Sequence, residues 1–204
     1  MLRSLTSEVK GDFREEKIGE LFDFPKTNAK ITRKFCIKNE GPIPVYASSK
    51  DENATIGHIA DNIKKIKYYE NCLSYNRNGS VGYVFIRNHK FTTNEDHRTM
   101  LIKEKYKNKL FKDYLKYEIE RNLFLNGFNY LDKCGVAKIK KVNIQIPIDE
   151  AGEFDYEAQK ETLKTLIDFG RQKLTMWQSF HHLVRDFAMM QNQPTTAVYR
   201  ESES

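Results

Sequence analysis

The sequence predicts an α+β fold: a curled, mostly antiparallel sheet with short helices, followed by one long C-terminal coiled-coil helix. Two observations support this class. Short runs rich in β-branched and aromatic residues alternate with polar loops between residues 41 and 104, as in antiparallel sheets. Apolar residues then recur four and three positions apart from residue 156 to residue 190, which is the spacing of a coiled-coil seam.

Two strand-like runs, residues 72–75 and 81–86, predict a β-hairpin with a polar tip. The five residues between them read Asn-Arg-Asn-Gly-Ser, and an Asn-Gly step supplies the positive φ angles of a tight turn. Such a turn would project Asn76, Arg77 and Asn78 away from the strands, and these side chains suit hydrogen bonds to base edges and phosphates. The same residues are also ordinary turn formers, so a purely structural hairpin is the alternative interpretation.

Composition bounds the chain to one domain with an extension and favours a polyanionic partner. The 204 residues are 39% hydrophobic and 30% charged, a polar balance that suits an extended shape or a large wet surface. The net charge of +6 favours nucleic acid over a membrane as that partner.

Cysteine usage and hydropathy predict a soluble cytoplasmic protein. The three cysteines, Cys36, Cys72 and Cys134, are odd in number and far apart, so they indicate neither a disulfide framework nor a zinc site. The first twenty residues lack an apolar core of signal-peptide length. Because no run reaches the roughly 18 apolar residues of a membrane span, we expect no membrane association.

The N-terminal part of the chain predicts little regular structure. Residues 1–17 are polar without a sustained period and are expected to form a flexible N-terminal segment. Residues 18–22 show helical spacing and predict a short helix that Pro25 ends. A basic loop is expected over residues 26–34.

Residues 41–46 (GPIPVY) predict an edge strand, because each proline removes a ladder donor and forbids a central position. A polar loop over residues 47–53 and a strand over residues 55–59 follow. After the hairpin, a polar loop is expected over residues 92–99 and a strand over residues 100–104. Short strands joined by polar loops imply a mostly antiparallel sheet.

The next two elements are predicted from their periodicity. Residues 110–125 place apolar side chains three and four apart and predict an amphipathic helix. Residues 138–146 alternate apolar and polar side chains and predict a half-buried strand, ended by Pro147. Asp155 is the candidate N-cap of the helix that follows.

The long helix over residues 156–190 is predicted to pair with another chain. At 1.5 Å per residue it would be ~50 Å long, more than a small domain can cover. Its seam is formed by Leu163, Ile167, Gly170, Leu174, Trp177, His181 and Val184. Together with the preceding turn, the helix defines a spacer and dimerisation segment over residues 151–190, and a disordered tail is expected over residues 191–204.

The order of these elements resembles the target recognition domain of bacterial restriction-modification specificity (S) subunits. The resemblance is carried by Pro44-Val45-Tyr46, by Gly79-Ser80-Val81-Gly82 and by the strand from Lys138 to Pro147 that leads into the long helix. It covers about residues 18–190. It implies a DNA-binding recognition domain over residues 18–150 whose loops read one half of a site, and a terminal helix that docks methyltransferase subunits.

S subunits commonly carry two recognition domains and two spacer helices, whereas this chain has one of each. The resemblance therefore leaves three alternatives open. The chain is a half-subunit that forms a homodimer or pairs with a second specificity chain, a truncated gene product, or the specificity chain of a related type II restriction system.

Polar residues of the loops that connect neighbouring strands are expected to lie on one DNA-facing surface. They are Ser48, Ser49, Lys50, Asn53, Asn76, Arg77, Asn78, Ser80, His97 and Arg98. Double-stranded DNA is the expected partner, together with DNA methyltransferase (modification) subunits, and a restriction subunit is a further candidate partner.

The chain is predicted to be a non-catalytic specificity subunit. It lacks an Asp/Asn-Pro-Pro-aromatic methyltransferase motif, a Gly-rich phosphate loop and a His-Glu-x-x-His pair, so neither a cofactor nor a metal is expected. His89, Asn94 and His97 have no accompanying carboxylate or cysteine set with ligand spacing. The competing hypothesis is an enzyme, either a stand-alone nuclease that uses scattered carboxylates and Glu15-Glu16-Lys17 or another DNA-processing enzyme of unrecognised type. A third is a helical interaction protein without nucleic acid.

Overall fold

The computed structural model describes residues 11–28, 31–128 and 133–191, and side chains as far as residue 183. The chain divides into two compact units, Met1–Leu163 and Lys164–Ser204. Among the described residues, every strand belongs to the first unit, and the second consists of the remainder of helix α5 (Tyr156–Gln191). The predicted α+β class and the long C-terminal helix are confirmed.

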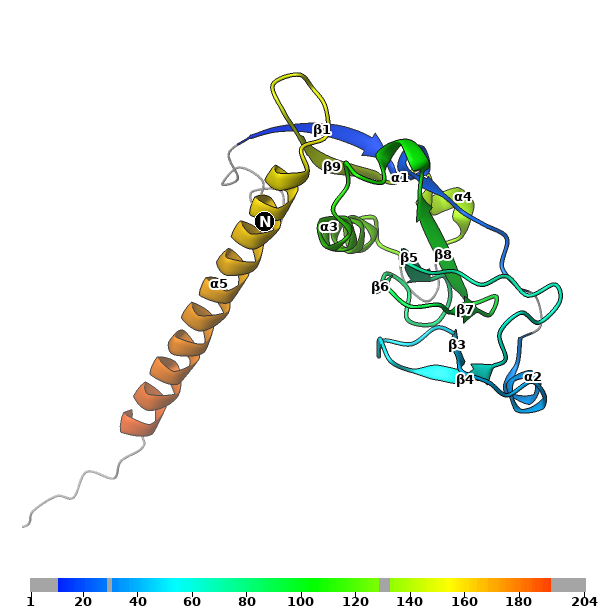
Figure 1. Cartoon of the computed structure of the whole chain (residues 1–204). Coiled ribbons are helices and arrows are strands. Elements are labelled where there is room, and N and C mark those ends of the chain that lie inside the picture. The colour runs from blue at the N-terminus through cyan, green and yellow to red at the C-terminus, as the bar shows by residue number, and fades with distance from the viewer. Residues whose placement is uncertain (1–10, 29–30, 129–132, 192–204) are drawn as a thin grey trace, which may run out of the picture. The chain divides into compact units, whose positions relative to one another are not determined.

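The elements of the first unit follow the chain from β1 to the start of α5 (Figure 1). They are β1 (Asp12–Lys17), α1 (Ile18–Leu21), β2 (Phe22–Asp23), α2 (Arg33–Lys38), β3 (Ile43–Tyr46), β4 (Thr55–Ile59), β5 (Cys72–Asn76), β6 (Val84–Arg87), β7 (Thr92–Thr93), β8 (His97–Ile102), a 3₁₀ turn (Glu104–Tyr106), α3 (Lys112–Leu125), α4 (Val136–Ile139) and β9 (Asn143–Ile148).

These strands form three small sheets. β1 pairs with β9; β2, β8, β5 and β6 form a four-stranded sheet in that order; β4, β3 and β7 form a three-stranded sheet. Every pair is antiparallel except β3 with β7. The predicted antiparallel pairing is therefore confirmed, with the strands divided among three sheets.

Helix α3 covers the main core. Its apolar side, formed by Leu115, Ile119 and Leu123, is fully buried and belongs to one cluster with Leu73 of β5 and Ile146 of β9. The helix lies against β5, β6 and β9 (Figure 1). Burial of residues spaced three and four apart confirms the predicted amphipathic helix.

A second, smaller core lies between α2 and the β3–β4 hairpin. Cys36 of α2, Val45 of β3 and Ile59 of β4 are buried together. Helix α2 approaches β4 closely because Gly57 stands opposite Cys36. A Cβ added at Gly57 would lie 2.6 Å from the Cβ of Cys36, and the φ of Gly57 is +152°. A side chain at position 57 would therefore displace α2 from the hairpin.

Two predictions at the ends of the first unit are wrong. Residues 12–17, for which the sequence predicts a flexible segment, form β1 and pair with β9 from Asp12↔Ile148 to Lys17↔Asn143. Residues 136–139 form α4, so the strand predicted from residue 138 begins only at Asn143. It continues through Pro147, because β9 has a partner on one side only and an edge strand tolerates proline. Residues 1–10 and 192–204, predicted to be flexible and disordered, lie outside the described residues.

The edge position predicted for β3 from its prolines is also wrong, because β3 is the central strand of its sheet. Pro44 pairs with His58 of β4, while the parallel pairing with β7 begins only at Val45. The ladder to β7 therefore starts after the proline, and no donor is required from its nitrogen.

Regular structure also occurs where the sequence predicts loops. Helix α2 begins at residue 33, because the hydroxyl of Thr32 accepts a hydrogen bond from the backbone N–H of Phe35 at 3.2 Å and caps the helix. Within the predicted loop 92–99, β7 and the start of β8 are strands. The predicted N-cap of α5 is confirmed, since the Asp155 carboxylate accepts from the N–H of Ala158 at 2.9 Å.

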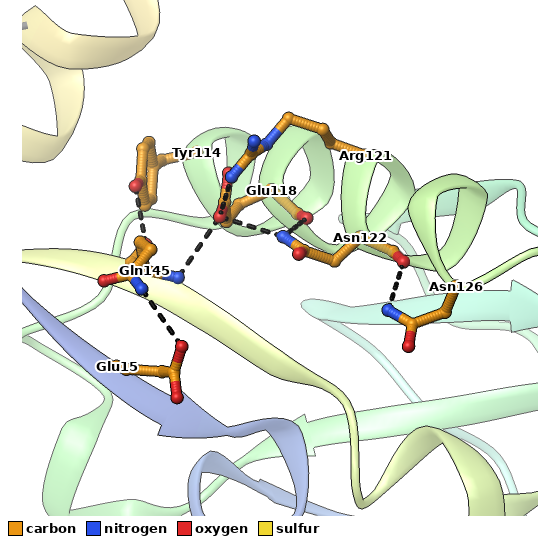
Figure 2. Close-up of polar contacts among 7 residues, drawn as sticks. All are labelled: Glu15, Tyr114, Glu118, Arg121, Asn122, Asn126 and Gln145. Carbon is orange, nitrogen blue, oxygen red and sulfur yellow. Dashed lines mark hydrogen bonds and ion pairs between the residues drawn. The ribbon is translucent and has the colours of Figure 1, made fainter. Parts of the chain in front are cut away.

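A buried carboxylate joins α3 to β9 (Figure 2). Glu118 is 2% exposed. Its Oε1 accepts hydrogen bonds from Arg121 Nη2 at 2.7 Å, from Asn122 Nδ2 at 2.9 Å and from the backbone N–H of Gln145 at 3.1 Å. Its Oε2 accepts from Arg121 Nε at 2.9 Å. The hydrogen bond to Glu118 raises the pKa of Arg121, so the charge of the carboxylate is balanced where it is buried.

A second buried polar group, His97 of β8, lies where the four-stranded and three-stranded sheets meet. Its ring is 6.3 Å from that of Tyr46 on β3 and 5.6 Å from that of Phe85 on β6, between centroids. Burial, together with the smaller effect of the Arg87 charge, lowers the pKa of His97 to about 3. The ring is therefore neutral at neutral pH, and its Nδ1, 2.8 Å from Asn76 Oδ1, donates to that oxygen.

Replacing Glu118 with Gln should lower the free energy of unfolding by about 2–4 kcal/mol. The variant keeps the shape of the side chain but turns one acceptor oxygen into a donor that faces the donors of Arg121 and Asn122. Urea denaturation measures the loss. Glu104→Gln is the matched control, because Glu104 forms an exposed ion pair with Lys107 and should change stability by less than about 1 kcal/mol. Equal losses in the two variants would contradict the buried role of Glu118.

The stability of the fold should decrease as the pH falls from about 6.5 toward 3, because unfolded His97 takes up a proton that the buried ring does not. The contribution of His97 to the free energy of unfolding is fully present above pH ~6.5, and below that pH it declines by about 1.4 kcal/mol per pH unit. His97→Gln keeps a donor toward Asn76 and removes the titration. The stability difference between wild type and variant should narrow by about 1.4 kcal/mol between pH ~5.5 and ~4.5, and parallel curves would refute a neutral buried histidine.

Candidate nucleic-acid interface

Three loops of the first unit meet at one end of the two larger sheets, and we call them the three-loop surface. They are residues 47–54 between β3 and β4, residues 77–83 between β5 and β6, and residues 94–96 between β7 and β8. The strand register brings them together. Asn76 pairs with His97 across β5 and β8, and Tyr46 pairs with Thr93 across β3 and β7, so each loop begins beside another.

Asp96 ties the three loops to one another. Its backbone oxygen accepts hydrogen bonds from Ser48 Oγ and from the backbone N–H of Arg77, both at 3.0 Å. Its carboxylate accepts from the side-chain amide of Asn78. One residue of the third loop therefore holds a residue of the first and two of the second.

Asn76, which is buried at the end of β5, binds the first and second of these loops. Its Nδ2 donates to the backbone oxygens of Ser49 at 2.6 Å and Ser80 at 2.9 Å, while its Oδ1 accepts from His97. The side chains of Asn76 and His97 are fully buried. The prediction that these two residues lie on a DNA-facing surface is therefore wrong, because their polar groups bind the protein's own loops and each other.

Arg87 supports the loop 47–54 from within the fold. It is 2% exposed, and its Nη1 donates to the backbone oxygen of Glu52 at 2.6 Å. Its guanidinium lies 3.5 Å from the ring centroid of Tyr46, whose hydroxyl is 2.9 Å from His89 Nε2. Burial lowers the pKa of Arg87. Sequence reasoning missed this residue, although its two-residue spacing from Phe85 on one strand places both on the same face.

The remaining predicted residues lie at or near the surface. Lys50 and Asn53 are exposed, and Ser48, Ser49, Arg77, Asn78, Ser80 and Arg98 are half-buried. Arg98 belongs to β8 instead of a loop, and its Nη1 donates to Thr27 Oγ1 at 2.8 Å. Ser48 and Asn78 use their side chains to join the loops. DNA contact by this set stays a prediction.

The three-loop surface carries charges of both signs. The exposed acids Asp51 and Glu52 share the first loop with Lys50, and exposed Glu95 of the third loop lies beside Arg77 of the second, whose Nη1 is 3.5 Å from the Glu95 backbone oxygen. A phosphate backbone alone attracts only the cations, whereas base edges present both donors and acceptors. The arrangement therefore suits hydrogen bonding to base edges more than uniform attraction to phosphates.

The carboxylates of the competing nuclease hypothesis take part in contacts within and between strands. Glu15 accepts hydrogen bonds from the side-chain amides of Asn143 at 2.7 Å and Gln145 at 3.2 Å, the latter drawn in Figure 2. Glu16 forms an ion pair with Arg14 at 2.9 Å. These contacts account for both residues as parts of the β1–β9 sheet.

Helix α5 presents exposed apolar side chains in the second unit. Ile167, Leu174 and Trp177 of the predicted seam are 41%, 56% and 58% exposed. Leu163 at the end of the first unit is half-buried, Gly170 and His181 are exposed, and the side chain of Val184 lies outside the described residues. The rings of Trp177 and His181 pack edge to face, with centroids 3.9 Å apart. Within the described part of the chain, no helix has both the length and the apolar character needed to cross a membrane.

Comparison with known proteins connects this architecture to one family. A family model for the type I restriction modification DNA specificity domain matches residues 10–177. Two putative type I specificity subunits of Mycoplasma pneumoniae are similar in sequence. One is 27% identical over 119 residues, which cover 57% of this chain and 47% of that protein, and the other is 23% identical over 140 residues, covering 69% and 37%. The chain thus spans less than half the length of these relatives.

Solved structures share the fold. The S subunit of a type I system from M. genitalium matches with a TM-score of 0.53 and 14% identity over 91% of this chain and 47% of that one. The HsdS subunit from Thermoanaerobacter tengcongensis matches with a TM-score of 0.59 and 14% identity over 87% and 44%. A structure described for complex assembly and conformational transition of the type I restriction-modification system gives 0.58 and 13% over 93% and 48%.

The resemblance to S subunits is therefore confirmed. The matched range begins just before β1, contains every strand of the described chain and runs into α5. It includes all three loops of the three-loop surface. The chain belongs to the family of type I restriction-modification DNA specificity domains.

Proposed function

We propose that the three-loop surface reads a DNA sequence and that the chain is the specificity component of a restriction-modification system. The observation that carries this proposal is the locking of the loops by buried donors. Asn76 and Arg87 both bind backbone oxygens of the loop 47–54, and Asn76 also binds the hairpin tip. Loops that are ordered before binding lose less conformational entropy on contact with DNA, so their side chains meet base edges at fixed positions.

The side chains of the surface match the hydrogen-bonding groups of bases. Arg77 can fork onto the O6 and N7 acceptors of a guanine, and Asn53 can pair with N6 and N7 of an adenine. The carboxylate of Glu95 can accept from a cytosine amino group, while Lys50 suits a phosphate. Such a set reads a short sequence, which we assign to one half of a bipartite site.

Catalysis belongs to partner chains in this proposal. The chain directs DNA methyltransferase (modification) subunits, and with them a restriction subunit, to the site that its loops read. The recognition domain extends to residue 150 and starts at β1 rather than at residue 18, because β1 pairs with β9. Residues 151–190 are the spacer segment.

A second copy of the chain is the proposed partner of α5. The exposed stripe through Ile167, Leu174 and Trp177 is an aggregation hazard unless another surface covers it. In an antiparallel pair of these helices, the stripe of each copy would pack on the stripe of the other. Gly170 permits close approach there, since nothing lies within 4 Å of a Cβ added to it. Two-fold pairing would make the DNA target two inverted copies of one half-site.

Arg77→Ala should relax the DNA preference at one base position, at a cost of about 1–3 kcal/mol for the preferred sequence. The measurement is selection by the full chain from a pool of random duplexes, followed by affinities for the selected motif and its single-base variants. Lys141→Ala, at an exposed position outside the three loops, is the control and should leave the motif unchanged. An equal loss for every sequence would make Arg77 a phosphate contact. Failure of the wild-type chain to select any motif would refute DNA reading.

Trp177→Asp should dissociate the dimer while the first unit stays folded. Placing a carboxylate in the centre of the seam should weaken association by at least about 2 kcal/mol, or roughly thirtyfold in dissociation constant. Light scattering on the full chain at micromolar concentration measures the mass. Gln172→Asp adds the same charge at an exposed position of α5 outside the seam and should remain dimeric. A monomeric wild type would instead favour pairing with a second specificity chain.

A further inference from the structure

A cationic face lies on the small lobe built around α2, apart from the three-loop surface. Its members are exposed and come from α2 and from the segment that leads to β5; they are Arg33, Lys34, Lys38, Lys64, Lys65 and Lys67. We call it the α2 face. Within the part of the chain that the structure describes, none of these six side chains forms an ion pair or a side-chain hydrogen bond.

Both segments are fixed to one core. Phe35 and Cys36 of α2 pack with Ile63 and Ile66 in the second hydrophobic cluster. Buried Asn28 pins the segment, since its Oδ1 accepts from the backbone N–H of Lys67 and its Nδ2 donates to the backbone oxygen of the same residue, both at 2.8 Å. The cations are therefore presented by an ordered backbone.

The β3–β4 hairpin connects the α2 face to the three-loop surface. The loop 47–54 joins the two strands at one end of the hairpin (Figure 1). Helix α2 packs against β4 at Gly57, and its C-cap residue, Asn39, accepts a hydrogen bond from the N–H of Ala60 at 2.7 Å beyond the other end. The five residues of β4 span about 16 Å at ~3.3 Å each, so the C-terminal end of α2 at Asn39 lies about the length of five base pairs from the loop 47–54 along the strand.

We propose that the α2 face binds the phosphate backbone of the DNA flanking the bases read by the three-loop surface. This inference rests on the proposed function. The three-loop surface carries both signs of charge, whereas the acids next to α2 and in the segment that leads to β5 are exposed Glu40, exposed Glu70, and Asp61, which is paired with Lys90 at 2.6 Å. Six unpaired cations outnumber the two acids without an ion pair and complement a polyanion, and they carry no means of telling one base from another.

An exposed isoleucine of α2 fits the same partner. Ile37 is 78% exposed and lies three and four residues after Lys34 and Arg33, so it shares their side of α2. Long cationic side chains on either side reach phosphates, while the apolar group between them packs on the sugar that joins those phosphates.

The test compares two triple variants that each remove three positive charges from the full chain. Arg33→Gln/Lys34→Gln/Lys38→Gln removes the cations of α2, and Lys17→Gln/Lys105→Gln/Lys141→Gln removes exposed cations elsewhere in the first unit. The probe is a pool of random 40-base-pair duplexes (about four helical turns), with affinity measured across salt concentrations. Log affinity falls as log salt rises, and the α2 triple should make this fall shallower by about 2–3 units of slope. The loss of affinity between ~50 and ~200 mM salt should therefore be up to about fortyfold smaller than in the wild type.

The control triple should retain most of the wild-type dependence of affinity on salt. The α2 triple should still select the same DNA motif as the wild type. Ile37→Ser should weaken binding about fivefold without changing the slope, because it removes apolar contact and no charge. Equal slopes in the two triples, or an unchanged slope in the α2 triple, would overturn the inference while leaving the proposed function intact. Absence of a selected motif in the wild type would overturn the proposed function instead.

Discussion

The buried amide of Asn76 is the group on which the arrangement of the three loops depends. Loops at the end of a sheet leave backbone carbonyls without ladder partners, and each must be satisfied when it is buried. The two N–H groups of Asn76 meet the oxygens of Ser49 and Ser80, and its own oxygen is met by His97. All the hydrogen-bonding groups of the amide are engaged, so the first loop, the hairpin tip and β8 cannot shift independently. His97 stays neutral because it is buried, not because of this hydrogen bond, which a protonated ring would also donate.

Arg87 extends this constraint with a buried charge that forms no ion pair among the described residues, although the carboxylate of Glu52 acts to raise its pKa. Burial of a lone guanidinium is unfavourable, and here it is offset by the carbonyl of Glu52 and by the ring faces of Tyr46 at 3.5 Å and Phe85 at 4.9 Å. The loop oxygen is thus one of the few groups that stabilise the buried cation, which ties the position of the loop to the packing of the core. Glu118 is compensated differently, by a direct ion pair with Arg121 inside the α3–β9 contact.

The sequence predicted those features whose signals are local. The hairpin, the amphipathic helix α3 and the long helix α5 each repeat a spacing over consecutive residues. Strand β1 was missed because its partner, β9, lies at the far end of the first unit, and the central place of β3 was missed because the ladder to β7 starts after Pro44. Asn76 was wrongly predicted to contact DNA, because two of its binding partners are also distant in the sequence. A side-chain amide that can pair with the edge of an adenine can equally well bind two backbone oxygens. Only the register of β5 on β8 determines which it meets.

The way the loops are held also separates stability from recognition. Asn76 and Arg87 bind backbone oxygens of Ser49, Ser80 and Glu52, and a backbone oxygen is present whatever side chain its residue carries. Some loop side chains also help to hold the loops through hydrogen bonds, namely those of Ser48, Ser49, Asp51, Arg77, Asn78, Asn94 and Asp96. Exposed positions such as Lys50, Asn53 and Glu95 can change without removing a bond that fixes the loops. Because buried side chains hold the loops through backbone oxygens, the exposed loop side chains can be substituted, and the base contacts changed, while the loops keep their conformation.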